Sequence, residues 1–123
     1  MWIGFPPSAE DNRNYDLSAR DLLHAIEDTL YDLRWPHFRD DRFRVVANIS
    51  GQIFISYGEK VTIDIERDGW IRVRSECSFP LQWMDWGKNA SNVRRFLNAL
   101  EDVIDEGARS SRRRRREDDD YDD

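Results

Sequence analysis

The sequence is poor in cysteine. Cys77 is the only one among 123 residues, so a disulfide within the chain is excluded, which suits a reducing compartment. No stretch approaches the roughly 20 apolar residues that span a bilayer. The start, from Met1 to Pro7, lacks the basic region and apolar run of a secretory signal. We therefore expect a protein without a membrane association that works in the cytoplasm, or in the nucleus if the host is eukaryotic.

Lysine is also scarce. Only Lys60 and Lys88 accompany the arginines in a total of 19 basic residues, which face 25 Asp and Glu and leave a net charge of −6. A net acidic protein repels nucleic acid at long range, so binding to it would need a local basic patch. The length suits one domain with its own core. Six Phe, five Trp and four Tyr are too many for a disordered chain.

A first helix is predicted over 17–34, because apolar side chains recur there at helical spacing. Ser18 followed by Asp21 has the form of a capping box. The residue before a proline avoids the helical region, so Trp35-Pro36 should end this helix. The apolar stripe consists of Leu22, Leu23, Ile26, Leu30 and Leu33.

A second helix is predicted over 91–106, with Asn89 or Ser91 as its cap and Gly107 as its terminator. Residues 108–123 then form a tail of low complexity, in which a run of arginines precedes an acidic block. Because this tail has no apolar content, it is predicted to be disordered. The stripe of the second helix consists of Val93, Phe96, Leu97, Leu100, Val103 and Ile104.

Residues 42–77 alternate between apolar and polar side chains, as in an antiparallel sheet with one covered face. Four short strands are predicted, and they are joined by three hairpins into a meander. Their apolar positions run over 43–49, 53–57, 61–65 and 71–77. Each helix has one apolar stripe and the sheet has one apolar face. The sequence therefore predicts a two-layer α+β sandwich of order α-β-β-β-β-α, with the N- and C-terminal helices on one face of a four-stranded antiparallel sheet.

The register follows from the rule that directly opposed residues share a face. At the last hairpin, a three-residue loop of 67–69 sets Ile65 against Ile71 and Asp64 against Arg72, with Gly69 in the left-handed conformation. The same rule at the other two hairpins pairs Ala47 with Ile53, Val45 with Ile55 and Tyr57 with Val61. The domain would span 16–107 and follow an irregular leader of residues 1–15.

The uncovered face of the sheet is the first candidate site. The predicted register exposes Phe54, Trp70, Arg44, Arg72 and Arg74 on it. Trp and Arg are favoured anchors of protein interfaces, and exposed aromatics among arginines can also stack bases and hold phosphates. The alternative without a function is that Asp64 pairs with Arg72 while the leader covers the two aromatic side chains.

The segment 78–90 is the second candidate, because it crowds large apolar residues between Pro80 and Gly87. In it, Trp83 or Trp86 would anchor a partner, unless the segment packs mainly into the core. A third candidate is the polar side of the first helix, where an oxygen-and-imidazole metal site is geometrically allowed. The alternative there is a solvated acidic face. The residues concerned are Asp21, His24, Asp28 and Asp32.

No catalytic constellation or cofactor motif is present, and Cys77 has no expected histidine neighbour, so we expect neither an enzyme nor a cofactor. The leading hypothesis is a small non-catalytic protein-binding or adaptor module with a protein partner or self-association. Its binding residues would be Phe54, Trp70, Arg72, Arg74, Trp83 and Trp86. The alternative is single-stranded nucleic-acid binding by the same sheet face. Its further contacts would be Arg44, Arg112, Arg113, Arg114, Arg115 and Arg116. Weak metal binding on the first helix is the third hypothesis.

Overall fold

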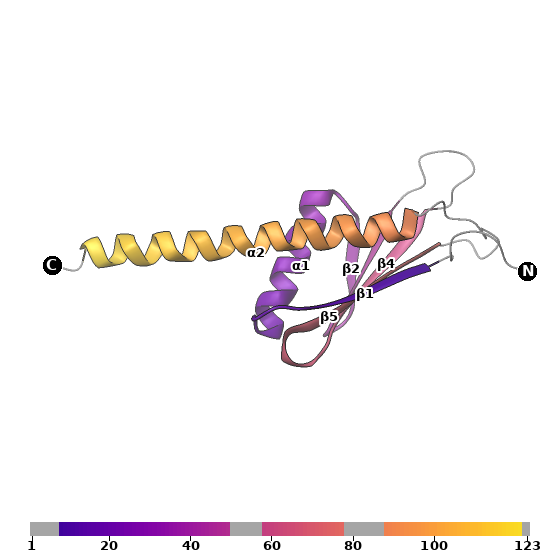
Figure 1. Ribbon diagram of the computed structural model, residues 1–123, viewed down its shortest axis with the longest axis horizontal. Coiled ribbons are helices and arrows are strands. Elements are labelled where there is room, and N and C mark those ends of the chain that lie inside the picture. The colour runs from indigo at the N-terminus through magenta and orange to yellow at the C-terminus, as the bar shows by residue number, and fades with distance from the viewer. Residues whose placement is uncertain (1–7, 50–57, 78–87, 122–123) are drawn as a thin grey trace, which may run out of the picture.

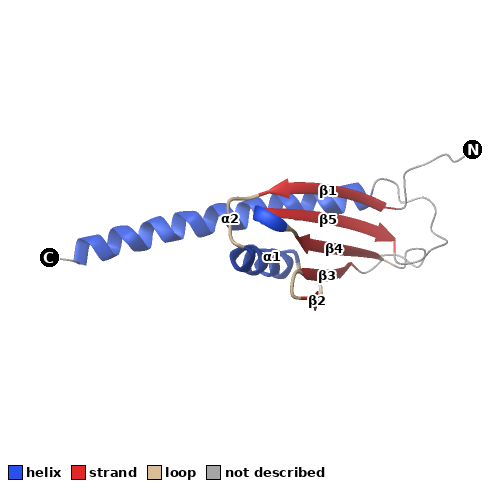
Figure 2. Ribbon diagram, turned by 90° about the horizontal axis from the view of Figure 1, so that it is seen from below, coloured by secondary structure: helices blue, strands red, loops and turns tan. Residues whose placement is uncertain are grey.

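The computed structural model describes residues 8–49, 58–77 and 88–121. They form an α+β fold in which two helices pack on one face of a five-stranded antiparallel sheet of order β1-β5-β4-β3-β2 (Figures 1 and 2). The predicted α+β class is confirmed, but the sheet has one strand more than predicted. The elements are β1 (Ser8–Asn14), α1 (Ala19–Leu33), β2 (His37–Asp41), β3 (Arg44–Ile49), β4 (Glu59–Ile65), η1 (Arg67–Gly69), β5 (Trp70–Cys77) and α2 (Lys88–Tyr121).

The predicted meander is wrong at its second strand. β3 pairs directly with β4, so Ala47 lies opposite Val61, and Val45 lies opposite Ile63. The other edge of β3 is taken by β2. Both edges of β3 are therefore occupied, which leaves no place for the predicted pairs of Ala47 with Ile53 and Val45 with Ile55. The same direct pairing excludes the predicted pair of Tyr57 with Val61, while residues 50–57 themselves lie outside the described ranges.

Two strands that the sequence did not predict form the edges of the sheet. β1 pairs antiparallel with β5, so residues 8–14 belong to the sheet and not to an irregular leader. β2 pairs antiparallel with β3 and has a register shift between Arg39 and Asp41. Both edge strands are rich in polar and charged side chains, SAEDNRN and HFRDD. Polar and charged side chains of this kind are common in strands at the edge of a sheet.

The β4–β5 hairpin has the predicted register. Ile65 pairs with Ile71, and Asp64 pairs with Arg72. Gly69 has a φ of +83°, the predicted left-handed conformation. The carbonyl of Gly69 accepts a hydrogen bond from the backbone N–H of Tyr15 at 2.8 Å. A Cβ at position 69 would lie 1.9 Å from the carbonyl oxygen of Tyr15, so only glycine lets the end of β1 close on this hairpin.

α1 begins at the predicted cap, because the Ser18 hydroxyl accepts a hydrogen bond from the backbone N–H of Asp21 at 3.1 Å. The helix ends at Arg34, which adopts the left-handed conformation with a φ of 60°. The following N–H, that of Trp35, donates to the carbonyl of Leu30 at 2.9 Å. This cap closes the helix one residue before the proline-directed end that the sequence predicts.

α2 is longer than predicted at both ends. It starts at Lys88, so Asn89 and Ser91 lie inside its first turns and neither is its cap. It continues past Gly107 to Tyr121, where the sequence predicts a disordered tail. One glycine costs a helix only about 1 kcal/mol relative to alanine, and no proline follows to stop it. In Figure 1 the C-terminal part of α2 projects beyond the sheet and α1.

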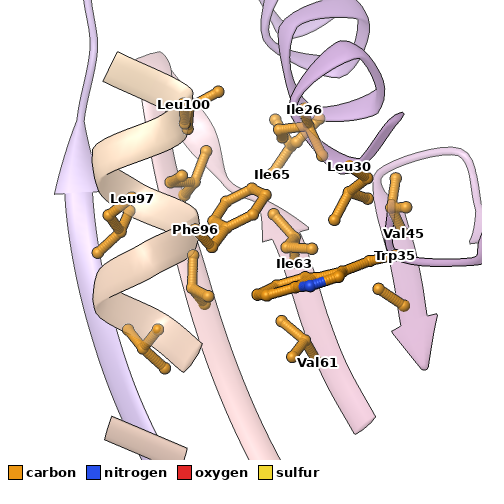
Figure 3. Packing of buried hydrophobic residues seen from close by; sticks show 14 of the residues in the cluster. Ile26, Leu30, Trp35, Val45, Val61, Ile63, Ile65, Phe96, Leu97 and Leu100 are labelled. Atoms are coloured by element: carbon orange, nitrogen blue, oxygen red, sulfur yellow. The ribbon is translucent and has the colours of Figure 1, made fainter. Parts of the chain in front are cut away.

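The core lies between the sheet and the two helices (Figure 3). Phe96 of α2 is fully buried among residues of α1 and the central strands. Trp35 closes one side of this cluster, and the guanidinium of Arg95 lies 5.8 Å from the centre of its ring. The buried members include Leu22, Ile26, Leu30, Val45, Val61, Ile63, Ile71, Val73, Leu97 and Leu100.

Candidate functional site

The face of the sheet that neither helix covers (Figure 2), called the outer face from here on, holds four of the described candidate residues. Arg44, Trp70, Arg72 and Arg74 all project from it, as their strand parity predicts. The predicted residue pairs set Arg44 in one row with Arg74 across the sheet. This row is wrong, because Arg44 stands beside Asp64 and Arg72. The direct β3–β4 pairing causes this shift. Phe54 lies outside the described residues.

Asp64 joins the arginines of neighbouring strands into a network. The Nε of Arg44 donates to Oδ1 of Asp64 at 2.6 Å, and Nη2 of Arg72 lies 3.9 Å from Oδ2 of the same carboxylate. The hydrogen bond to Asp64 raises the pKa of Arg44 further above its ordinary value. A single carboxylate thus orients two guanidinium groups on the outer face.

Arg44 and Arg72 each lie near a second carboxylate, and Arg74 lies near a carboxylate that is not part of this network. The Nη1 of Arg44 lies 3.8 Å from Asp40, and Nε of Arg72 lies 3.8 Å from Glu66. The Nη2 of Arg74 lies 3.5 Å from Glu76 of its own strand. All three arginine side chains remain between 44% and 54% exposed. The guanidinium groups are therefore oriented by carboxylates and still accessible to a partner.

The network borders a shallow depression of about 250 Å³ on the outer face. Trp70 lies two residues before Arg72 on β5, on the same face, and is 47% exposed. At the other side of the sheet, Phe38 is 52% exposed beside the buried Val46. The depression is lined by Glu10, Arg44, Lys60, Thr62, Asp64, Arg72, Arg74 and Glu76.

A second polar cluster, which the sequence did not predict, lies on the covered face. It consists of Glu59, Ser75, Asn89 and Asn92, all at most 4% exposed. The Ser75 hydroxyl donates to Oδ1 of Asn89 at 2.8 Å, and Nδ2 of Asn92 donates to Glu59 at 3.2 Å and to Ser75 at 3.3 Å. Glu59 and Asn89 each make a further interaction. We call this group the buried polar cluster.

The buried polar cluster fixes the first turns of α2 on β4 and β5. Buried polar groups are costly without hydrogen bonds, so the four side chains favour one position of the helix on the sheet. The sequence carries little signal for this cluster, because the predicted pair of Tyr57 with Val61 places Glu59 in a turn, and Asn89 is a predicted helix cap. Once β3 pairs with β4, Glu59 becomes a strand residue opposite Cys77, and its side chain falls on the covered face.

The polar side of α1 shows no metal-binding arrangement. Asp21, His24, Asp28 and Asp32 are all exposed. Across residues 8–49, 58–77 and 88–121, no three His, Cys, Asp or Glu side chains come together as metal ligands would. Glu27 on this helix is instead hydrogen-bonded by Arg39 of β2, which lowers the pKa of the Glu27 carboxyl below its usual value.

The remaining predicted contacts are two tryptophans and a run of five arginines. Trp83 and Trp86 lie outside the described residues. Arg112, Arg113, Arg114, Arg115 and Arg116 belong to the projecting part of α2. Among the described residues, no helix is long and apolar enough to cross a membrane.

No family model matches this chain, and no curated protein matches it.

Proposed function

We propose that this protein is a non-catalytic binding module whose outer face docks on another protein, with Trp70 as the central anchor. The observation that carries the proposal is an exposed tryptophan beside oriented arginines on a sheet face that neither helix covers. Tryptophan and arginine contribute most often to the affinity of protein interfaces, because each combines a large contact area with directional donors.

The charge pattern of the outer face favours a protein over nucleic acid. Around the depression, Arg44 and Arg72 share Asp64, and Arg74 has Glu76 beside it. A phosphate backbone would have to compete with these carboxylates and would also meet Glu10. A protein surface of mixed charge can satisfy both signs at once. Nucleic-acid binding, which also relies on Arg112 to Arg116, is thus the second candidate.

The first experiment places a photo-crosslinking amino acid at Thr62, which lines the depression, and in a separate protein at Asp28, on the exposed side of α1. Both proteins are irradiated in the native lysate with and without nuclease. We expect a nuclease-resistant protein adduct from position 62 and none from position 28. Equal adducts from both positions would contradict the proposal.

The second experiment adds Trp70→Ala to the position-62 protein and uses Tyr31→Ala as its control, because Tyr31 is 71% exposed but lies on α1. Removing a tryptophan anchor should lower the affinity for the captured partner by roughly tenfold or more, while the tyrosine change should leave this affinity unchanged. If affinity instead follows a single-stranded oligonucleotide and falls steeply with salt, the nucleic-acid alternative replaces the proposal.

A further inference from the structure

The open edge of β1 offers backbone groups that point away from the sheet. The N–H of Tyr15 faces β5, because it donates to the carbonyl of Gly69. Backbone direction alternates along a strand, so the groups of Asp11 and Arg13 also face β5, whereas those of Asn12 face outward. β1 is the terminal strand of the sheet, and Figure 2 shows no described element beyond it.

Two charged side chains of β1 itself satisfy the outward groups at its centre. Oδ1 of Asp11 accepts a hydrogen bond from the N–H of Asn12 at 2.8 Å. The Nη1 of Arg13 donates to the carbonyl of Asn12 at 3.0 Å and lies 2.7 Å from Oδ2 of Asp11. The Arg13 and Asp11 side chains are 45% and 39% exposed. Exposed ion pairs contribute little to stability. The contacts of Asp11 and Arg13 with the backbone of Asn12 can therefore be exchanged for equivalent contacts at low cost.

We propose that β1 pairs antiparallel with β1 of a second copy of this chain, around a two-fold axis at Asn12. Backbone pairing requires that the outward-facing residues Glu10, Asn12 and Asn14 meet one another across the axis. An axis at Asn12 pairs Asn12 with Asn12 and Glu10 with Asn14 of the second copy. This inference is independent of the outer face and of its proposed partner.

The charges select this register over its neighbours. With the axis at Asn12, Asp11 stands opposite Arg13 of the second copy, and Arg13 stands opposite its Asp11. An axis at Asp11, at Arg13 or at Glu10 would instead place the residue on the axis opposite the same residue of the second copy, so that two like charges meet. Opposite charges in directly facing positions stabilise a strand pair and like charges destabilise it. The hydrogen bonds and the ion pair within β1 are thus replaced by backbone hydrogen bonds and ion pairs between the two copies.

The groove beside β1 gives the pairing a second layer. A hollow of about 310 Å³ separates β1 from α2 and holds Arg94 and Glu101 on its helical side. Glu101 marks the Tyr15 end, because the Tyr15 hydroxyl donates to it at 3.2 Å. Because α2 packs against β1 on the covered face, a two-fold axis at Asn12 places α2 of both copies on the same side of the paired strands.

The interface is short, since it joins one strand and one helix of each copy. Standard stable interfaces bury about 800 Å² of each partner, and a smaller contact gives a dissociable dimer. We therefore expect a monomer–dimer equilibrium in the micromolar range, visible by sedimentation equilibrium of the full chain. A monomer at all concentrations up to the millimolar range would overturn the proposal.

Charge reversal provides the decisive test. Asp11→Lys and Arg13→Glu each place like charges opposite one another in the homodimer, and each should weaken dimerisation at least about tenfold. Mixing the two variants should restore a dimer, because the introduced lysine then faces the introduced glutamate and the unchanged Arg13 faces the unchanged Asp11. Reversal without restoration on mixing, or a dimer that resists both reversals, would overturn the proposed register.

Two further variants separate the interface from folding. Asn12→Pro removes the outward N–H and leaves the hydrogen bonds to β5, so it should abolish the dimer while circular dichroism still reports a folded chain. Arg42→Glu, an exposed charge reversal in the turn between β2 and β3, should leave the dimer unchanged. A dimer that is lost with Trp70→Ala and retained with Asn12→Pro would place self-association on the outer face and contradict the inference.

Discussion

The two faces of the sheet each hold a carboxylate among hydrogen-bond donors, but in opposite environments. Inside, Glu59 is 1% exposed and accepts from the amide of Asn92. Outside, the Asp64 side chain is 19% exposed and lies between the guanidinium groups of Arg44 and Arg72. The inner carboxylate accepts from a side-chain amide away from water, and the outer carboxylate meets charged donors that water can also reach.

This difference separates what holds the fold from what is available for binding. When a donor is removed inside, the buried carboxylate loses a partner that water cannot replace, so the loss falls on stability. When a partner is removed outside, water hydrates the exposed group, so stability changes little. The outer arginines can therefore exchange their carboxylates for those of a partner without unfolding the domain.

The largest expected effect is on the buried polar cluster. Asn92→Ala removes the amide that donates to Glu59 and Ser75, and should lower the free energy of unfolding by about 2–3 kcal/mol. Urea denaturation of the dilute protein measures it. Asn98→Ala, the same change at an exposed position of α2, should stay within about 0.5 kcal/mol. Equal losses of unfolding free energy in the two variants would contradict the conclusion that the buried polar cluster holds the fold.

Tyr15 is an intermediate case, half-buried at the end of β1. Burial raises the pKa of its phenol well above its usual value, and the nearby Glu101 carboxylate raises it further. The unfolded chain loses this proton near pH 10 while the folded chain keeps it, so stability should fall as pH rises above about 10. Tyr15→Phe should flatten this fall in urea titrations at pH 9 to 11. Tyr31→Phe, at an exposed tyrosine, should leave it in place.

A smaller effect is expected at the centre of the outer face. Asp64→Asn removes the charge that orients Arg44 and Arg72, and should lower the free energy of unfolding by less than about 1 kcal/mol. The effect should shrink further at high salt, because exposed charges are screened. A loss comparable to that of Asn92→Ala would show that the outer network supports the fold and is not free to exchange partners.

The smallest effect is expected from the projecting part of α2. Removing residues 109–123 should lower the helical signal in circular dichroism and leave the urea midpoint unchanged, because this part of the helix extends away from the sheet and α1 (Figure 1). A clear shift of the midpoint would mean that the projecting part stabilises the body of the protein.

The sequence could predict what depends on local pattern. The Ser18 cap follows from a short-range motif. The register of Ile65 with Ile71 follows from alternation and one glycine-containing turn. The common face of Trp70, Arg72 and Arg74 follows from the period of two along a strand. Each of these needs information from only a few consecutive residues.

The errors arose where long-range pairing overrides pattern. Residues 53–57 alternate like a strand, yet β3 and β4 pair without them. β1 and β2 hold few apolar side chains, so their place in the sheet depends on the backbone of β5 and β3 and not on a hydrophobic face. Glu59 was missed for the same reason, since its burial follows from the β3–β4 pairing and the docking of α2.

The pairing of the first strand with the last has a consequence for synthesis. β1 is made early, but β5 begins only at Trp70. At roughly 5–20 residues per second on the ribosome, β1 waits several seconds for its partner. Its polar sequence, SAEDNRN, disfavours aggregation of the unpaired segment during this time. An unpaired apolar segment would be prone to aggregate with other nascent chains on the same polysome. The polar composition that makes β1 difficult to predict as a strand thus suits a strand whose partner, β5, is synthesised much later.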